Sequence, residues 1–221
     1  MCRLYRNGVP QAILLHVLHA RHPDELEATI EQLVADDRQF ALLAIPIEDW
    51  ELELMPWAEP VVSRRPEVGI GAEDTLSYII DTLLPTLDKD TVYANPSPLP
   101  IVFGGYSLGG LFALWASCRT DRFAAVAAGS PSLWAGPWPQ YADGNPTRAT
   151  YVYLSLGESE GHTKNKTMAT CADRVRDEHS RLVHQLGENN TTLVWEHGGH
   201  FTDPGGRMAR AYAWCLDRVE K

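Results

Sequence analysis

The chain has few cysteines and no long apolar run. Its four cysteines (Cys2, Cys118, Cys171 and Cys215) are scattered over 221 residues and form no C-x-x-C pair. This pattern requires no disulfide framework and is typical of the reduced thiols of a cytosolic protein. No stretch reaches the roughly 18 apolar residues of a membrane-spanning helix. The first residues also lack the apolar core and cleavage site of a secretory signal. We therefore expect a soluble, cytoplasmic protein.

Basic residues are also few. The sequence holds 19 lysines and arginines against 29 acidic residues, which gives a formal net charge of -10. An acidic surface disfavours nucleic acids and anionic membranes as partners, so we expect neither. The length, with 44% hydrophobic residues, suffices for one domain with a sizeable core. We expect residues 1–221 to form that single domain.

The signatures of metal and nucleotide cofactors are missing too. His197 and His200 do not form an H-E-x-x-H motif, and no third ligand lies at a supporting spacing. The glycine pairs at 104–105 and 109–110 do not have the spacing of a dinucleotide-binding loop. We therefore expect no metal and no other cofactor.

The most informative segment that is present is Gly-Tyr-Ser-Leu-Gly-Gly at 105–110, which fits G-x-S-x-G. The residues before it, from Leu99, have the pattern of a buried strand, and those after it, from Leu111, that of an apolar helix. A serine at the apex of a tight turn between strand and helix is the nucleophile elbow of the α/β-hydrolases. Glycines suit this turn because a side chain there would crowd it. Ser107 is therefore the predicted nucleophile.

Strand-like and helix-like runs alternate along the rest of the chain. The predicted strands are mostly continuous apolar runs: Ala12–His19, Phe40–Pro46, Leu99–Gly104, Ala124–Ala128, Tyr151–Leu156 and Thr192–Glu196. The predicted helices lie between and after them: from Pro23 to Val34, Ala72–Leu84 ending at Pro85, Thr167–Leu186 and Gly206–Val219. This alternation predicts an α/β-hydrolase fold, with a doubly wound, mostly parallel sheet, helices on both faces and no lid domain.

Two long segments, 48–71 and 130–150, are rich in proline and tryptophan. Structureless loops of such length are usually functional. Trp50, Trp57, Trp134 and Trp138 are candidates to wall a shallow pocket for an aromatic or acyl group, and Tyr106 is a further substrate-binding candidate. Packing in the core is the alternative for each tryptophan. Without a lid, we expect an open site that suits short-chain or bulky soluble esters.

A serine nucleophile needs a histidine base, and in this fold the chain order is serine, acid, histidine. Five histidines follow the serine: His162, His179, His184, His197 and His200. Gly198 and Gly199 precede His200 just past the last predicted strand, and they would let the loop curl back over the sheet. His200 is the predicted base, and a surface loop histidine is the alternative.

The predicted acid follows the preceding strand, where both Glu158 and Glu160 are candidates. An acid three residues past the strand-ending glycine commonly reaches the histidine in this fold, which favours Glu160. The alternative is that both are solvated acids paired with Lys164 or Lys166.

An oxyanion in the reaction also needs two hydrogen-bond donors. The elbow itself supplies the backbone N–H of Leu108. The second donor is expected in the loop after the first predicted strand, at Ala20 or at Arg21.

These motifs together resemble the putative-esterase branch of the α/β-hydrolases, which includes enterochelin esterases, S-formylglutathione hydrolases, feruloyl esterases and mycolyltransferases. The matching pieces are the elbow, Gly-Ser-Pro-Ser-Leu-Trp at 129–134 and Gly-Gly-His-Phe at 198–201. The resemblance runs from about residue 11 to residue 219, and this chain has His19-Ala20 where many members have His-Gly.

Motifs and resemblance together predict a serine esterase that cleaves a small-molecule carboxylic ester through a Ser-His-acid triad and an acyl-enzyme. An acyltransferase that uses the same triad is the alternative, followed by a non-catalytic binding module on the same fold. A homodimer is left open.

Overall fold

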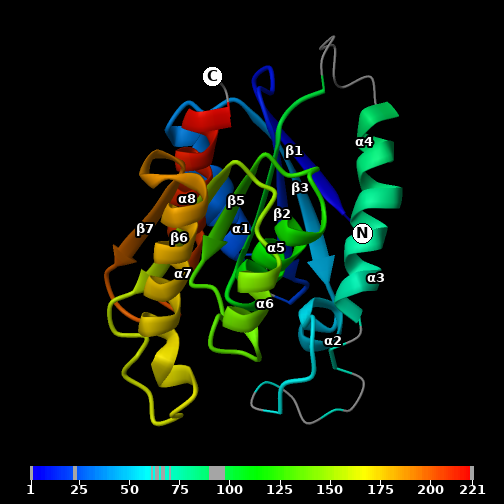
Figure 1. Ribbon diagram of the computed structural model, residues 1–221. Coiled ribbons are helices and arrows are strands. Elements are labelled where there is room, and N and C mark those ends of the chain that lie inside the picture. The colour runs from blue at the N-terminus through cyan, green and yellow to red at the C-terminus, as the bar shows by residue number, and fades with distance from the viewer. Residues whose placement is uncertain are drawn as a thin grey trace.

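The computed structural model describes residues 2–21, 24–60, 62, 65, 68–69, 71–89 and 98–219. A seven-stranded sheet, ordered β1-β3-β2-β4-β5-β6-β7, runs through its centre (Figure 1). The strands are β1 (Arg3–Asn7), β2 (Ile13–His19), β3 (Phe40–Ile47), β4 (Ile101–Tyr106), β5 (Ala125–Gly129), β6 (Tyr151–Gly157) and β7 (Thr191–Glu196). Only β1 pairs antiparallel, with β3, and the remaining pairs in this described sheet are parallel.

Helices cover both faces of the sheet (Figure 1). They are α1 (Asp24–Ala35), α2 (Trp50–Leu54), α3 (Gly71–Tyr78), α4 (Leu84–Lys89), α5 (Leu108–Arg119), α6 (Trp138–Gly144), α7 (Cys171–Leu186) and α8 (Pro204–Val219). Helices α1 and α8 bury Leu33 and Tyr212 against one face, whereas α5 and α7 bury Phe112 and Val175 in the core on the other. The predicted doubly wound, mostly parallel architecture is confirmed.

The first strand was not predicted from the sequence. β1 is a half-buried edge strand, and its sequence, Arg-Leu-Tyr-Arg-Asn, has no apolar run. An edge strand needs no such run because it packs on fewer neighbours than a central parallel strand. The six predicted strands are all present, with ends that shift by up to two residues.

The predicted helix end at Pro85 is wrong. The chain passes through a π-helical turn, Ile79–Leu83, and continues as α4, which contains Pro85. Proline breaks regular α-helix because it lacks an N–H and its ring presses on the carbonyl four residues earlier. Just before it the ladder widens, and Leu84 N–H bonds to Ile79 C=O. The widened turn accommodates the ring.

Short helices also interrupt the two segments that we expected to be structureless loops. α2 begins after Asp49, whose carboxylate accepts a hydrogen bond from Leu52 N–H and so caps the helix. α6 lies in the second segment. Pro23, the predicted start of the first helix, lies outside the described residues.

All four cysteines are free thiols, and all but Cys2 are buried. Among the helices of the described residues, none has both the length and the apolar character needed to cross a bilayer.

Candidate active site

The serine of the elbow lies between the end of β4 and the start of α5. Ser107 has φ 58° and ψ −118°, a backbone conformation in which side chains are strained. A Cβ on Gly105 would lie 2.7 Å from the backbone of Gly109 and 2.8 Å from Val17 Cγ2, so strand and helix can approach only through glycine here. The turn therefore raises Ser107 at the carboxyl edge of the sheet.

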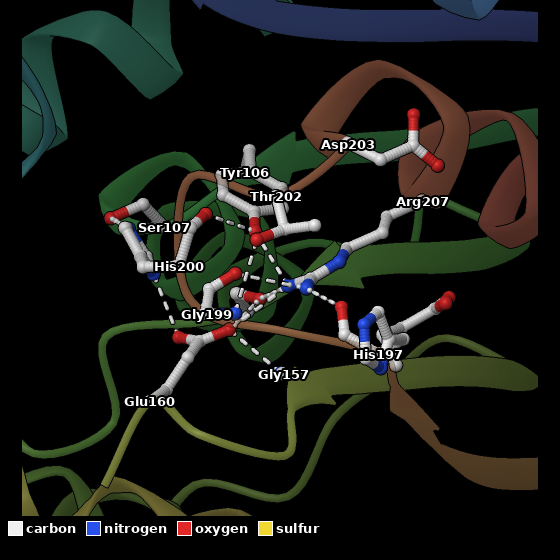
Figure 2. A network of polar contacts seen from close by, with 12 residues as sticks. Tyr106, Ser107, Gly157, Glu160, His197, Gly199, His200, Thr202, Asp203 and Arg207 are labelled. Atoms are coloured by element: carbon white, nitrogen blue, oxygen red, sulfur yellow. Dashed lines mark hydrogen bonds and ion pairs between the residues drawn. The ribbon is translucent and has the colours of Figure 1, made fainter. Parts of the chain in front are cut away.

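Two further loops bring a histidine and a carboxylate to this serine (Figure 2). His200, between β7 and α8, has Nε2 3.0 Å from Ser107 Oγ. Its Nδ1 lies 2.7 Å from Glu160 Oε2, in the loop after β6. The structure thus brings together the three residues that the sequence predicted. Glu158 is exposed and lines a separate hollow, beside Arg176.

Glu160 is held by four donors. Oε1 accepts hydrogen bonds from Gly157 N–H at 2.7 Å and Ser130 Oγ at 2.7 Å, and it pairs with Arg207 Nη1 at 3.0 Å. Burial by itself raises the pKa of this carboxyl, but hydrogen bonds from His200, Ser130 and Gly157 outweigh it and leave the pKa below its usual value. Glu160 is therefore ionised at neutral pH and can hold His200 Nδ1–H.

Arg207 of α8 connects the acid to the histidine loop, and its side chain is 1% exposed. Nη2 donates to the carbonyls of His197 at 3.0 Å and Gly199 at 2.9 Å (Figure 2). Nη1 donates to the Tyr106 hydroxyl at 2.9 Å, and that hydroxyl donates to the His200 carbonyl at 2.7 Å. One guanidinium thus fixes the backbone on both sides of His200.

A protein-family model, Esterase, with the description "Putative esterase", matches residues 18–210. The chain belongs to this esterase family. It is a carboxylic ester hydrolase with the α/β-hydrolase fold. A search of curated proteins found no match.

Solved structures share the fold of this esterase. Siderophore hydrolase EstA from Aspergillus nidulans is 18% identical with a TM-score of 0.74, over 98% of this chain and 89% of that one. An IroE-like serine hydrolase from Shewanella oneidensis is 15% identical with a TM-score of 0.71, over 99% and 75%. The enterobactin esterase FES from Shigella flexneri is 17% identical with a TM-score of 0.63, over 96% and 55%. At these identities, the similarity shows the fold alone.

The predicted oxyanion donors of the esterase are only partly retained. Leu108 is the first residue of α5, so its N–H belongs to the group that a helix leaves without an intrahelical partner. Ala20 is not the second donor, because its N–H donates to Ile47 C=O at 3.0 Å. The β2–β3 pairing continues one residue past the strand and uses that N–H. Arg21 N–H donates a hydrogen bond to His19 Nδ1 at 3.2 Å, which is an exposed contact with a side chain two residues earlier rather than a bond of the sheet. Arg21 is the remaining candidate of the two.

A cavity of about 200 Å³ lies beside the predicted triad, and Ser107, His200, Trp50 and Tyr106 line it. Trp50 and His19 both line it, and their rings pack together with centroids 5.6 Å apart. A larger hollow of about 660 Å³, against β3, α2 and α3, is lined by none of the three predicted triad residues.

Three of the four tryptophans that were candidates to wall the pocket, Trp57, Trp134 and Trp138, do not line the cavity beside Ser107. Trp57 packs against Trp138 and Tyr141, with ring centroids 6.4 Å and 5.7 Å apart, and donates to Ala135 C=O at 3.3 Å. Trp134 is half-buried against the hydrophobic core. Packing in the core, the alternative to substrate contact, describes these positions.

Sequence reasoning missed several groups at the site, among them Ser132 and Arg207. Ser132 N–H donates to Ser107 C=O at 3.1 Å, and its Oγ lies 3.3 Å from Ser107 Oγ. Arg207 shares a helical face with Ala211 and Cys215, all buried. That spacing was a usable signal, because an arginine on a buried helix face requires a buried partner.

Proposed function

We propose that the esterase cleaves its substrate through a Ser107-His200-Glu160 triad and an acyl-enzyme intermediate. The observation that carries the proposal is the unbroken hydrogen-bond chain from Ser107 Oγ through the imidazole to the Glu160 carboxylate. This is the arrangement that activates a serine hydroxyl, which is otherwise a poor nucleophile at neutral pH.

The groups of the site divide the proposed reaction between them. Ser107 Oγ attacks the acyl carbon while His200 Nε2 takes its proton, and Glu160 holds the imidazole through Nδ1–H. The N–H of Leu108 and that of Arg21 stabilise the oxyanion. His200 then gives its proton to the departing alcohol. Water replaces the alcohol, His200 takes the proton of that water, and the acid is released as Ser107 Oγ regains a proton.

The proposed substrate is a small-molecule carboxylic ester. The cavity is small and has apolar walls from Trp50 and Tyr106 beside the serine, which suits a compact acyl or aromatic group. Siderophore esters are the first class to assay, because several solved structures with this fold carry the names siderophore hydrolase and enterobactin esterase.

The test is covalent labelling. Intact-protein mass after treatment with a fluorophosphonate should show one adduct on the wild type and none on Ser107→Ala. The wild type should also turn over p-nitrophenyl acetate and butyrate. A folded wild-type protein that takes no adduct and gives no turnover would overturn the proposal.

The assignment of the acid makes a separate prediction. Glu160→Gln should lower kcat about 10²- to 10⁴-fold, because an amide cannot accept from all the donors that surround this carboxylate and also orient His200. Glu158→Gln, the same change two residues away on an exposed side chain, should change kcat less than about two-fold. The measurement is steady-state hydrolysis of p-nitrophenyl acetate by both variants. If Glu158→Gln is the damaging change, the acid is misassigned.

A further inference from the structure

A buried histidine lines the cavity beside Ser107 and takes no part in the proposed triad. His16 is on β2, opposite Gly104 of β4, and is 3% exposed. Its Nδ1 lies 2.8 Å from the hydroxyl of Tyr212, which in turn lies 3.1 Å from Leu15 C=O. A Cβ on Gly104 would lie 2.6 Å from that hydroxyl oxygen, so glycine makes room for the contact.

These contacts determine where the imidazole carries its proton. A tyrosine hydroxyl has one proton and a carbonyl can only accept. Tyr212 therefore donates to Leu15, and His16 Nδ1–H donates to Tyr212. Burial lowers the pKa of His16 to about 4, so the ring is neutral near pH 7. In this tautomer Nε2 carries a lone pair and no proton.

That lone pair is open to the catalytic cavity. Nε2 has no hydrogen-bond partner among the described residues. It is not closed off from solvent, unlike the fully buried unpaired oxygens of Tyr141, Ser155 and Thr191. His16 lines the same cavity as Ser107 and His200. A largely buried acceptor without a protein partner is costly unless something else supplies the hydrogen bond.

We propose that His16 Nε2 accepts a hydrogen bond from a hydroxyl or N–H of the substrate, so that the esterase prefers esters that carry such a donor. This inference rests on the proposed function. Ser107 lies three residues beyond the partner of His16, about 10 Å along the sheet at about 3.3 Å per residue. The donor therefore belongs on an arm that extends several atoms from the ester carbonyl.

Matched esters test the subsite. One series is p-nitrophenyl ω-hydroxyalkanoates against the alkanoates in which a methyl replaces the hydroxyl. The second series has the same arms on the alcohol half of acetate esters. One half of the ester, acyl or alcohol, enters the subsite. In the series that varies that half, the wild type should prefer the hydroxyl ester over its methyl analogue by about ten-fold or more in kcat/KM at the best arm length. The methyl analogue leaves Nε2 unpaired.

Substitutions then assign the preference to His16. The hydroxyl-to-methyl ratio should fall close to one in His16→Leu. It should keep its wild-type value in His184→Leu, where an exposed histidine of α7 undergoes the same change. His16→Gln, which offers an amide oxygen as acceptor, should recover part of the preference.

The contrary outcomes are distinct. A wild-type ratio near one at every arm length, with plain esters hydrolysed, would overturn the subsite and leave the esterase mechanism standing. A preference that survives in His16→Leu would also overturn it. Failure of both hydrolysis and fluorophosphonate labelling would overturn the proposed function and the subsite together.

Discussion

Ser107→Ala is expected to lower kcat/KM for p-nitrophenyl acetate by about 10⁴- to 10⁶-fold, because the acyl-enzyme cannot form without Oγ. The fold should survive, since alanine fits the same turn and the hydrogen bond of 2.8 Å from residue 107 N–H to Gly129 C=O is a backbone contact. Far-UV circular dichroism and the thermal midpoint check that the variant is folded. End-point assays at high enzyme concentration determine the lowest rate that can be measured.

His200→Ala should cost about as much, and the double variant little more than either single one. Residues that act as a unit in one step are not additive, because removing one already removes the function of the other. His197→Ala is the matched control. Its side chain is exposed and its contact at the site is the backbone carbonyl that Arg207 holds, so the rate should stay within a few-fold. Independent losses that multiply in the double variant would contradict a shared proton transfer.

The predictable parts of this molecule are those whose chemistry depends on neighbours in sequence. The elbow is one, because the strand, glycines, serine and helix that form it lie within 20 residues. The Gly-Gly-His loop is another, because glycines mark a bend whatever lies around it. Glu160 was favoured over Glu158 by its spacing from the strand end, which is also local.

The errors arise where the result depends on contacts between distant segments. The N–H of Ala20 is used by Ile47, which is 27 positions away, and no local pattern reveals how far a strand pairing extends. Trp57 packs on residues about 80 positions later, so its place in an aromatic cluster could not be predicted from the sequence around it. The helix end at Pro85 was mispredicted because helix propensities describe the regular α-helix, whereas the chain contains a wider, π-helical turn just before this proline.

Arg207→Met is expected to lower the free energy of unfolding by roughly 3–5 kcal/mol, because it leaves a buried carboxylate without its cation. Glu160 is 6% exposed and cannot recover that interaction from water. The carbonyls of His197 and Gly199 lose their donors as well. Denaturant titration measures the loss. Arg176→Met is the control, since its ion pair with Asp173 is exposed on both sides and should be worth less than about 1 kcal/mol.

A positioning role for Arg207 predicts more than lost stability. The rate of fluorophosphonate labelling, measured well below the thermal midpoint and per folded molecule, should fall about ten-fold or more in Arg207→Met, because the loop on both sides of His200 is released. Arg207→Lys keeps the charge beside Glu160 but loses the planar fork that spans several acceptors, so it should restore stability more than labelling. Equal labelling rates in folded wild type and Arg207→Met would show that the guanidinium stabilises the fold without orienting the base.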